Sequence, residues 1–270
     1  MFKRTYGSGL SATIICASLV LSACGGGGGS GGSSSSGGDA STLKAGLYEA
    51  KVEYVNGASS QTAVTYLSPA GDFTSVFRGG AGVSIGKLAF DTTRISGVSS
   101  DYRQLGPEQL DPTGFVEDKG TQEGTINGTI SSQGSATFST TDAADQVNTN
   151  VTLQRQNLIS DVGISLKRTS GTYVKGESEV ALTIGADGSL DAQYYTQTTG
   201  CQLVGIEALS VPDASINVFD INYTMSNCTN DNRNGEYSGV GYFIPMNNQQ
   251  MRVVFATHNG KVAMRFSGAK

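Results

Sequence analysis

The sequence contains no tryptophan and a single histidine among 270 residues. Without tryptophan it lacks the largest aromatic platform on which a sugar ring could stack, although tyrosines could take that role. Any Ser-His-Asp triad would have to use His258, the one histidine. No pair of carboxylates is singled out for glycoside cleavage either. We therefore expect no catalytic residues, and the chain is predicted not to be an enzyme.

The sequence also lacks runs of basic residues and a long apolar run. Its formal net charge is -5, and no stretch of five or more Lys and Arg occurs, so we expect no nucleic-acid partner. The main apolar stretch, residues 10–21, is shorter than the roughly 20 residues of a permanent membrane helix. It follows Lys3 and Arg4 and precedes small residues, which is the pattern of an export signal. Residues 1–23 are therefore interpreted as a signal peptide.

The end of this segment, Leu21-Ser22-Ala23-Cys24, resembles the lipobox of bacterial lipoproteins. The resemblance implies that Cys24 carries palmitate and other acyl chains, so that the membrane is a partner through this anchor. The residue directly after the cysteine is Gly25, and this position resembles that of lipoproteins sorted to the outer membrane, in which it is not Asp. The alternative is an ordinary secretory signal with an incidental cysteine. Residues 25–38 contain only Gly and Ser, a composition typical of a flexible tether, and residues 24–41 form the lipidated segment.

Beyond Cys24, two cysteines remain, Cys201 and Cys228. Because an exported protein lies in an oxidising compartment, we expect a disulfide between them. A reactive thiol or metal pair is the alternative, but no histidine lies nearby. Asn230, Asn232 and Asn234 resemble the start of a calcium loop, yet Gly241 stands where the bidentate Glu is needed. We expect a tight turn there, with no metal and no cofactor.

From residue 42 onward, short runs of alternating polarity are separated by Gly, Asn and Asp turns. This pattern predicts an all-β fold of antiparallel β-barrels or sandwiches, with two units. Asn259-Gly260 predicts a two-residue hairpin that pairs Thr257 with Val262. The same register places His258 and Arg265 on a solvent-exposed face.

Two similar tripeptides favour an internal duplication. Gly46-Leu47-Tyr48 opens the first half, and Gly171-Thr172-Tyr173 opens the second. We therefore predict a β domain at residues 42–156, a linker at 157–169 and a β-barrel-like domain at 170–270. One sheet system shared by both halves is the alternative.

The second half resembles small β domains of uncharacterised Gram-negative lipoproteins. The motifs that carry this resemblance are Gly171-Thr172-Tyr173, Asp187-Gly188-Ser189, Gly200-Cys201, Asn227-Cys228 and Gly235-Glu236-Tyr237-Ser238-Gly239. The resemblance implies no catalytic signature. The order of anchor, tether and β domains is also similar to that of host-factor-binding surface lipoproteins, without a shared local motif.

Two further segments are candidate sites. Gly82-Val83-Ser84-Ile85-Gly86 matches the G-x-S-x-G pattern of hydrolases, but neither the strand before it nor the helix after it is indicated. Residues 99–122 form a long segment with two prolines, and such loops are often functional. Its possible contact residues are Tyr102, Leu105, Leu110 and Phe115. The alternative is an insertion whose apolar residues cap a barrel.

These observations favour a non-enzymatic binding or adhesion module that is anchored to the outer membrane and recognises an unknown protein partner. Its domains would face either the cell surface or the periplasm. A lipocalin-like carrier is the first alternative, and it requires a barrel interior of several hundred Å³ rather than one filled by side chains. A hydrolase is the second.

Overall fold

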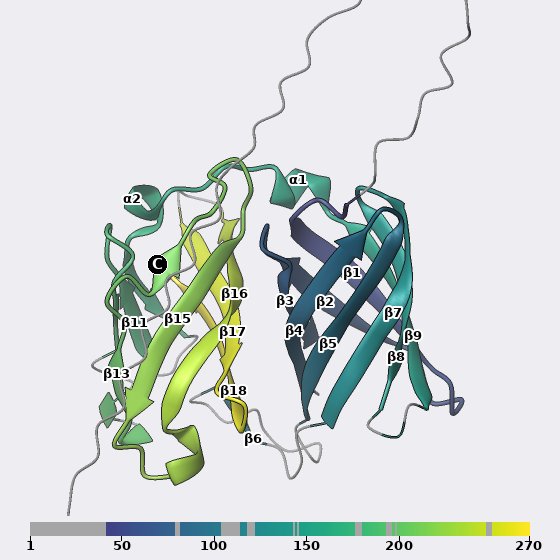
Figure 1. The fold of residues 1–270 in the computed structure, drawn as a ribbon. Coiled ribbons are helices and arrows are strands. Elements are labelled where there is room, and N and C mark those ends of the chain that lie inside the picture. The colour runs from purple at the N-terminus through teal and green to yellow at the C-terminus, as the bar shows by residue number, and fades with distance from the viewer. Residues whose placement is uncertain are drawn as a thin grey trace, which may run out of the picture. The chain divides into compact units, whose positions relative to one another are not determined.

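The computed structural model describes residues 42–78, 82–103, 114–117, 122–142, 144, 146–175, 180–192, 196–197, 199–246 and 250–270. These residues form an all-β, antiparallel structure with two sheets, as the alternating pattern predicted (Figure 1). Cys24, the predicted tether, Leu105 and Leu110 lie outside the described residues.

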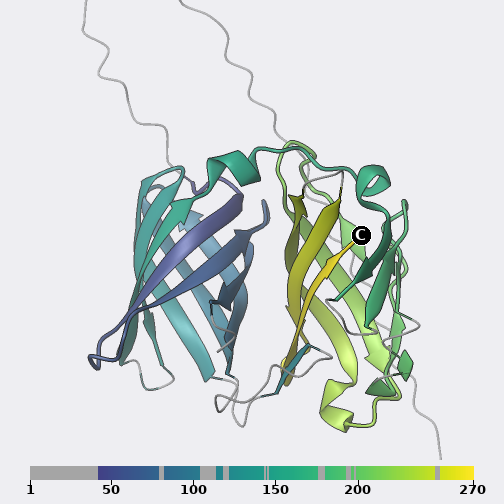
Figure 2. The same ribbon diagram turned by 180° about the vertical axis from the view of Figure 1, so that it is seen from behind.

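The first sheet is a closed barrel. Its strands in order are β1 (Gly46–Tyr54), β2 (Gln61–Leu67), β3 (Asp72–Phe77), β4 (Gly82–Asp91), β5 (Arg94–Arg103), β7 (Gln122–Ser132), β8 (Ser135–Thr141) and β9 (Val147–Arg155). The last strand, β9, pairs with β1 and closes the ring (Figures 1 and 2). Closure leaves no free edge, and a barrel of about eight strands has room for side chains or one small ligand.

The second sheet is a nearly closed barrel of shorter strands. They are β10 (Gly171–Val174), β11 (Ala181–Ile184), β12 (Leu190–Asp191), β13 (Gln202–Val204), β14 (Leu209–Ser210), β15 (Phe219–Ser226), β16 (Gly235–Pro245), β17 (Met251–His258) and β18 (Val262–Ala269). They follow the order β12-β11-β10-β18-β17-β16-β15-β13, and an isolated bridge joins Leu190 to Gly205. The short strand β14 also pairs with β15.

One strand of the second sheet comes from the first half of the sequence. Strand β6 (Phe115–Glu117) pairs with β18, so the chain leaves the first barrel after β5 and returns for β7. Both sheets belong to one compact unit. The segment between them contains the one-turn helices α1 (Asn157–Ser160) and α2 (Leu166–Thr169).

Only short helices occur among the described residues. Besides α1 and α2, a 3-10 turn η1 (Asp231–Arg233) precedes β16. In the part of the chain that the structure describes, no helix is long and apolar enough to cross a membrane.

Large side chains fill the interior of the second barrel. The rings of Phe219 and Phe243 lie 4.9 Å apart between centroids, and those of Phe255 and Phe266 lie 5.4 Å apart. The fully buried aromatic residues of this core are Tyr173, Phe219, Tyr237, Phe243, Phe255 and Phe266. This interior is therefore a packed hydrophobic core.

The C-terminal hairpin differs from the predicted register. Thr257 pairs with Met264 rather than with Val262, so the chain turns through residues 259–262. The Asn259 side chain stabilises the longer turn because its Oδ1 accepts hydrogen bonds from the backbone of Lys261 and Val262. A shift of two residues keeps each side chain on its predicted face.

The outer face of this hairpin was expected to be exposed, and that expectation was wrong. Ala256 and Ala263 are fully buried and pack with Val83, Ile85 and Tyr102 of the first barrel. Small apolar residues on this face let two sheets approach closely, which a single alternating strand does not reveal. The second sheet is thus buried on both sides around Ala256 and Ala263.

Candidate functional site

The interior of the first barrel contains a cavity of about 530 Å³. Small side chains leave this space because they occupy inward positions on neighbouring strands: Ala50, Ala63, Ser75, Ser84 and Ser99. Small-molecule sites usually measure about 300–1,000 Å³, so the cavity has the size of a ligand site. The two barrels therefore differ, since one holds a cavity and the other a packed core.

The cavity has an open end and a closed end. At the open end, the exposed residues Asn56, Ala58 and Ser59 of the β1–β2 turn contribute to its lining. At the other end the barrel is filled by buried side chains, including Tyr48 and Leu67. A ligand could therefore enter the cavity at its open end and be enclosed by the barrel strands.

One wall of the cavity carries a row of polar side chains. Thr65, Ser75, Ser84 and Asp101 are successive register partners on β2, β3, β4 and β5. Thr65 and Ser75 share a hydrogen bond of 2.7 Å between their hydroxyl oxygens. The Ser84 hydroxyl donates to a carboxylate oxygen of Asp101. Because side chains directly opposite on paired strands lie about 5 Å apart, the row is continuous.

The opposite wall is mainly apolar. Val52, Ile126, Val151 and Leu153 line it from β1, β7 and β9, and Phe138 of β8 packs against them. The polar pair on this side, Thr140 and Thr149, is mutually hydrogen-bonded with 2.6 Å between the hydroxyl oxygens. The cavity therefore has one polar wall and, opposite it, one mainly apolar wall.

The serine of the G-x-S-x-G pattern belongs to this cavity. Residues 82–86 lie within β4 and form no strand-to-helix turn. Ser84 faces the barrel interior, whereas His258 is hydrogen-bonded through Nδ1 to the hydroxyl of Tyr102. Asp101 and Tyr102 are neighbours on β5, and successive side chains of a strand point to opposite faces. The barrel wall therefore separates Ser84 from the histidine.

Two of the four predicted loop residues are described, and both are buried. Tyr102 is 0% exposed and packs between the sheets, while Phe115 is 3% exposed in the core of the second barrel. The guanidinium of Arg233 lies over the Phe115 ring, 4.0 Å from its centroid. Both side chains pack inside the protein and are not surface contact residues.

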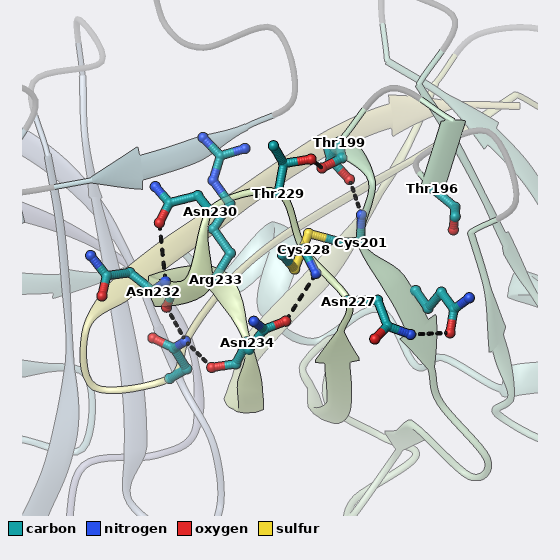
Figure 3. Close-up of a disulfide and its surroundings, with 12 residues drawn as sticks. Thr196, Thr199, Cys201, Asn227, Cys228, Thr229, Asn230, Asn232, Arg233 and Asn234 are labelled. Atoms are coloured by element: carbon teal, nitrogen blue, oxygen red, sulfur yellow. Dashed lines mark hydrogen bonds between the residues drawn. A yellow bond between two sulfur atoms is a disulfide. The ribbon is translucent and has the colours of Figure 1, made fainter.

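Cys201 and Cys228 form the predicted disulfide (Figure 3). Around it, Cys201 N donates to the Thr199 hydroxyl, and Cys228 N donates to Asn234 Oδ1 at 3.0 Å. The bond joins Cys201, the residue directly before β13, to Cys228 in the turn after β15. It therefore closes the edge of the second sheet where its strands are shortest.

The asparagines after Cys228 also have structural roles. Asn230 Oδ1 accepts a hydrogen bond from Asn232 N at 3.0 Å and caps the turn η1 (Figure 3). Asn259 Nδ2 donates to the backbone oxygens of Asn232 and Asn234. Among the described residues, no group of three His, Cys, Asp or Glu side chains is arranged to hold a metal ion.

A larger groove of about 800 Å³, lined by polar and apolar residues of both sheets, lies beside the first barrel. Asp72, Lys87, Asp220 and His258 are among its lining residues, and Lys87 pairs with Asp72 at 3.1 Å. Burial raises the pKa of Asp220, and its Oδ1 has no hydrogen-bond partner among the described residues. We prefer the barrel cavity as the functional site because it combines an apolar wall with convergent polar groups, as ligand sites do.

Comparison of the chain with protein-family models, curated proteins and solved structures finds no match. Sequence reasoning did not locate the cavity. The available signal was the series of small residues at alternate positions of β1 to β5, which in a barrel marks an unfilled interior.

Proposed function

We propose that this protein is a carrier that binds one small, largely apolar molecule inside its first barrel. The observation that supports this most directly is the open-ended cavity of about 530 Å³. The proposal adopts the carrier alternative in place of protein adhesion. The second barrel, with its aromatic core, then acts as a scaffold packed against the first.

In this proposal Cys24 attaches the carrier to the outer membrane through its acyl chains, as the lipobox resemblance implies. The protein would act without a cofactor and without catalysis. The separation of Ser84 from His258 supports a binding role, because a nucleophilic serine needs a base within hydrogen-bond reach.

The test is binding of the neutral fluorescent probe N-phenyl-1-naphthylamine to the purified protein. Ala63 is fully buried and lines the cavity, so Ala63→Phe places a ring in the ligand space. The adjacent Thr62 lies on the other face of β2, and Thr62→Phe is the matched control. We expect saturable binding by the wild type, at least tenfold weaker binding by A63F, and unchanged binding by T62F.

Absence of saturable binding to the wild type would refute the carrier proposal. Equal affinity of wild type and a folded A63F would place the probe elsewhere and would also refute it. Near-ultraviolet circular dichroism establishes that each variant retains the native packing.

Recognition of a protein partner is the second candidate function. It is favoured by exposed apolar side chains at the edge of the second sheet, where Val204 is 56% and Ile206 is 85% exposed. Both residues border a groove of about 480 Å³. If this edge binds a partner, Ile206→Asp abolishes its capture from envelope or host proteins. The control, Leu158→Asp in α1, changes an equally apolar exposed side chain elsewhere and leaves capture intact.

A further inference from the structure

Exposed aliphatic side chains gather in the segment between the two barrels. Leu158 and Ile159 of α1 are 95% and 38% exposed, and Val162, two residues after α1, is 39% exposed. We infer that these three side chains, the α1 patch, contact the bilayer to which Cys24 is anchored and hold the mouth of the cavity away from it. The inference rests on the anchor at Cys24 in the proposed function, and it gives the carrier an orientation.

The chain from Cys24 enters the folded unit beside this patch. Two residues after the described chain begins, Lys44 Nζ donates to Asp161 Oδ1 at 2.8 Å. Leu47 N donates to the hydroxyl of Ser160, also at 2.8 Å. The start of β1 is therefore bonded to α1 and to the residue that follows it, and both lie at the same end of the first barrel (Figures 1 and 2). The patch is thus at the end of the barrel to which the anchored segment connects.

The anchored segment is short enough to keep this end near lipid. Residues 25–41 separate Cys24 from the first described residue. A Gly- and Ser-rich linker of this length has a root-mean-square span on the order of 20 Å. One acyl chain alone binds a membrane only marginally, so three aliphatic side chains would not hold an unanchored protein there. On an anchored protein the contact is intramolecular, and its high effective concentration makes a weak contact sufficient.

The charges beside the patch also suit a lipid surface. The segment from residue 156 to residue 170 contains the exposed Lys167 and Arg168 and a single acid, Asp161, which is paired with Lys44. This segment is therefore locally positive in a chain whose formal net charge is -5. Aliphatic side chains bury themselves at the boundary between headgroups and acyl chains, and neighbouring cations are attracted to anionic headgroups.

This orientation decides from which side a ligand reaches the cavity. Strand β1, purple in Figure 2, runs from the α1 end of the barrel to the β1–β2 turn at the open end of the cavity. Its 9 residues span roughly 30 Å. With the α1 patch on the bilayer, the mouth of the cavity faces the aqueous side, and the carrier takes up its ligand from there rather than from the membrane that holds it.

The experiment measures how deeply each end of the barrel lies in lipid. The fluorophore NBD is attached at Leu158→Cys in one protein and at Ser59→Cys, in the exposed turn at the cavity mouth, in another. Each mature lipidated protein is reconstituted into vesicles of phosphatidylethanolamine and phosphatidylglycerol. We expect NBD at position 158 to emit at a shorter wavelength than NBD at position 59. We also expect doxyl-labelled lipid to quench the label at position 158 at least twofold and to leave the label at position 59 almost unchanged.

Two further variants test whether the patch itself makes the contact. In the L158C protein, Ile159→Asp together with Val162→Asp should reduce the quenching at position 158 to the level found at position 59. Ile206→Asp is the matched control, because it changes an 85% exposed isoleucine at the edge of the second sheet, and it should leave the quenching intact.

The possible results separate this inference from the proposals on which it rests. Equal quenching at positions 158 and 59 would overturn it. A short-wavelength emission at position 158 that doxyl-labelled lipid does not quench would show a protein contact instead, and would also overturn it. A protein that does not float with the vesicles would refute the anchor at Cys24 and the inference with it. Binding of N-phenyl-1-naphthylamine to the unlabelled protein reports on the carrier function independently of all three results.

Discussion

Tyr102 and His258, 156 residues apart in the chain, share a hydrogen bond of 2.6 Å between the phenol oxygen and Nδ1. Burial raises the pKa of Tyr102 to about 12 and lowers the pKa of His258. At neutral pH the phenol therefore keeps its proton, and the imidazole is neutral. This bond joins the first barrel to the second across a buried apolar cluster.

Burial of His258 makes stability depend on pH. Because the folded-state pKa of His258 lies below its ordinary value of 6.5, the unfolded chain binds the proton first as pH falls. Its contribution to stability is therefore present above about pH 6.5 and is lost progressively below that pH. We expect the urea midpoint of the wild type to fall relative to that of His258→Asn between pH 7.5 and 5. Subtracting the two curves removes the opposing effect of Asp220, whose pKa is raised. Parallel curves would show that His258 does not titrate differently on folding.

A second prediction concerns the repeated Gly-x-Tyr motif. The hydroxyls of Tyr48 and Tyr173 donate to the backbone oxygens of Lys44 and Thr169, each four residues earlier. Replacing either tyrosine by Phe leaves a backbone oxygen without this donor, so we expect a loss of about 1 kcal/mol of unfolding free energy. Urea titration measures it. Tyr242→Phe is the control, because it removes the hydroxyl of a buried tyrosine whose ring packs against Tyr66 in the cluster between the sheets. Equal effects of all three changes would contradict the structural role.

The same geometry recurs at a third site. Tyr237 donates to the backbone oxygen of Arg233 at 2.9 Å. The glycines two residues before the three tyrosines share a φ near +140°, with values of 140° at Gly46, 141° at Gly171 and 135° at Gly235. Few side chains tolerate this conformation, which explains why glycine occupies each position. The motif therefore marks the start of a strand in both barrels and recurs within the second.

The third prediction concerns the disulfide. Cys201 and Cys228 are separated by 27 positions. Closing a loop of this size restricts the unfolded chain, and removing the bond should lower the unfolding free energy by about 3 to 4 kcal/mol. We expect this loss in a C201A/C228A variant and, for the wild type, on addition of a reducing agent. Unfolding of the double variant should not respond to the reductant. A loss below about 1 kcal/mol would show that the edge of the second sheet is held mainly by packing.

The fourth prediction compares two cations that contact the same carboxylate. The Arg155 side chain is 3% exposed and donates to Asp161 and to Ala45 O, whereas the Lys44 side chain is half exposed and donates to Asp161. Hydrogen bonds from both, with that from Arg155 the stronger, lower the pKa of Asp161. Arg155→Met should cost about 2 kcal/mol because a buried backbone oxygen loses its donor. Lys44→Met should cost about 0 to 1 kcal/mol, as exposed pairs do. Thermal and urea unfolding of both variants measure the contrast, and equal costs would contradict it.

The fold class and the disulfide could be predicted from the sequence because their causes are local. Side chains alternate between the two faces of a strand, so alternating polarity predicts a strand without knowledge of its neighbours. Turn residues such as Asn259-Gly260 predict where a strand ends. The pairing of Cys201 with Cys228 could be predicted because they are the two cysteines that follow residue 24. The length of the turn at Asn259 escaped prediction because a side-chain hydrogen bond, not the dipeptide alone, selected the register.

The tertiary structure decided where the faces of the strands lie. The face of β17 that carries Ala256 and His258 reads as solvent-exposed in the sequence, yet it is covered by the first barrel. Tyr102, predicted as a loop contact, is buried in the same place. The cavity arises because small residues from five strands face the same interior space, although they are far apart in the sequence. Pattern alone determines which side chains share a face, but only closure of the barrels determines whether that face meets water, a neighbouring sheet or an empty interior.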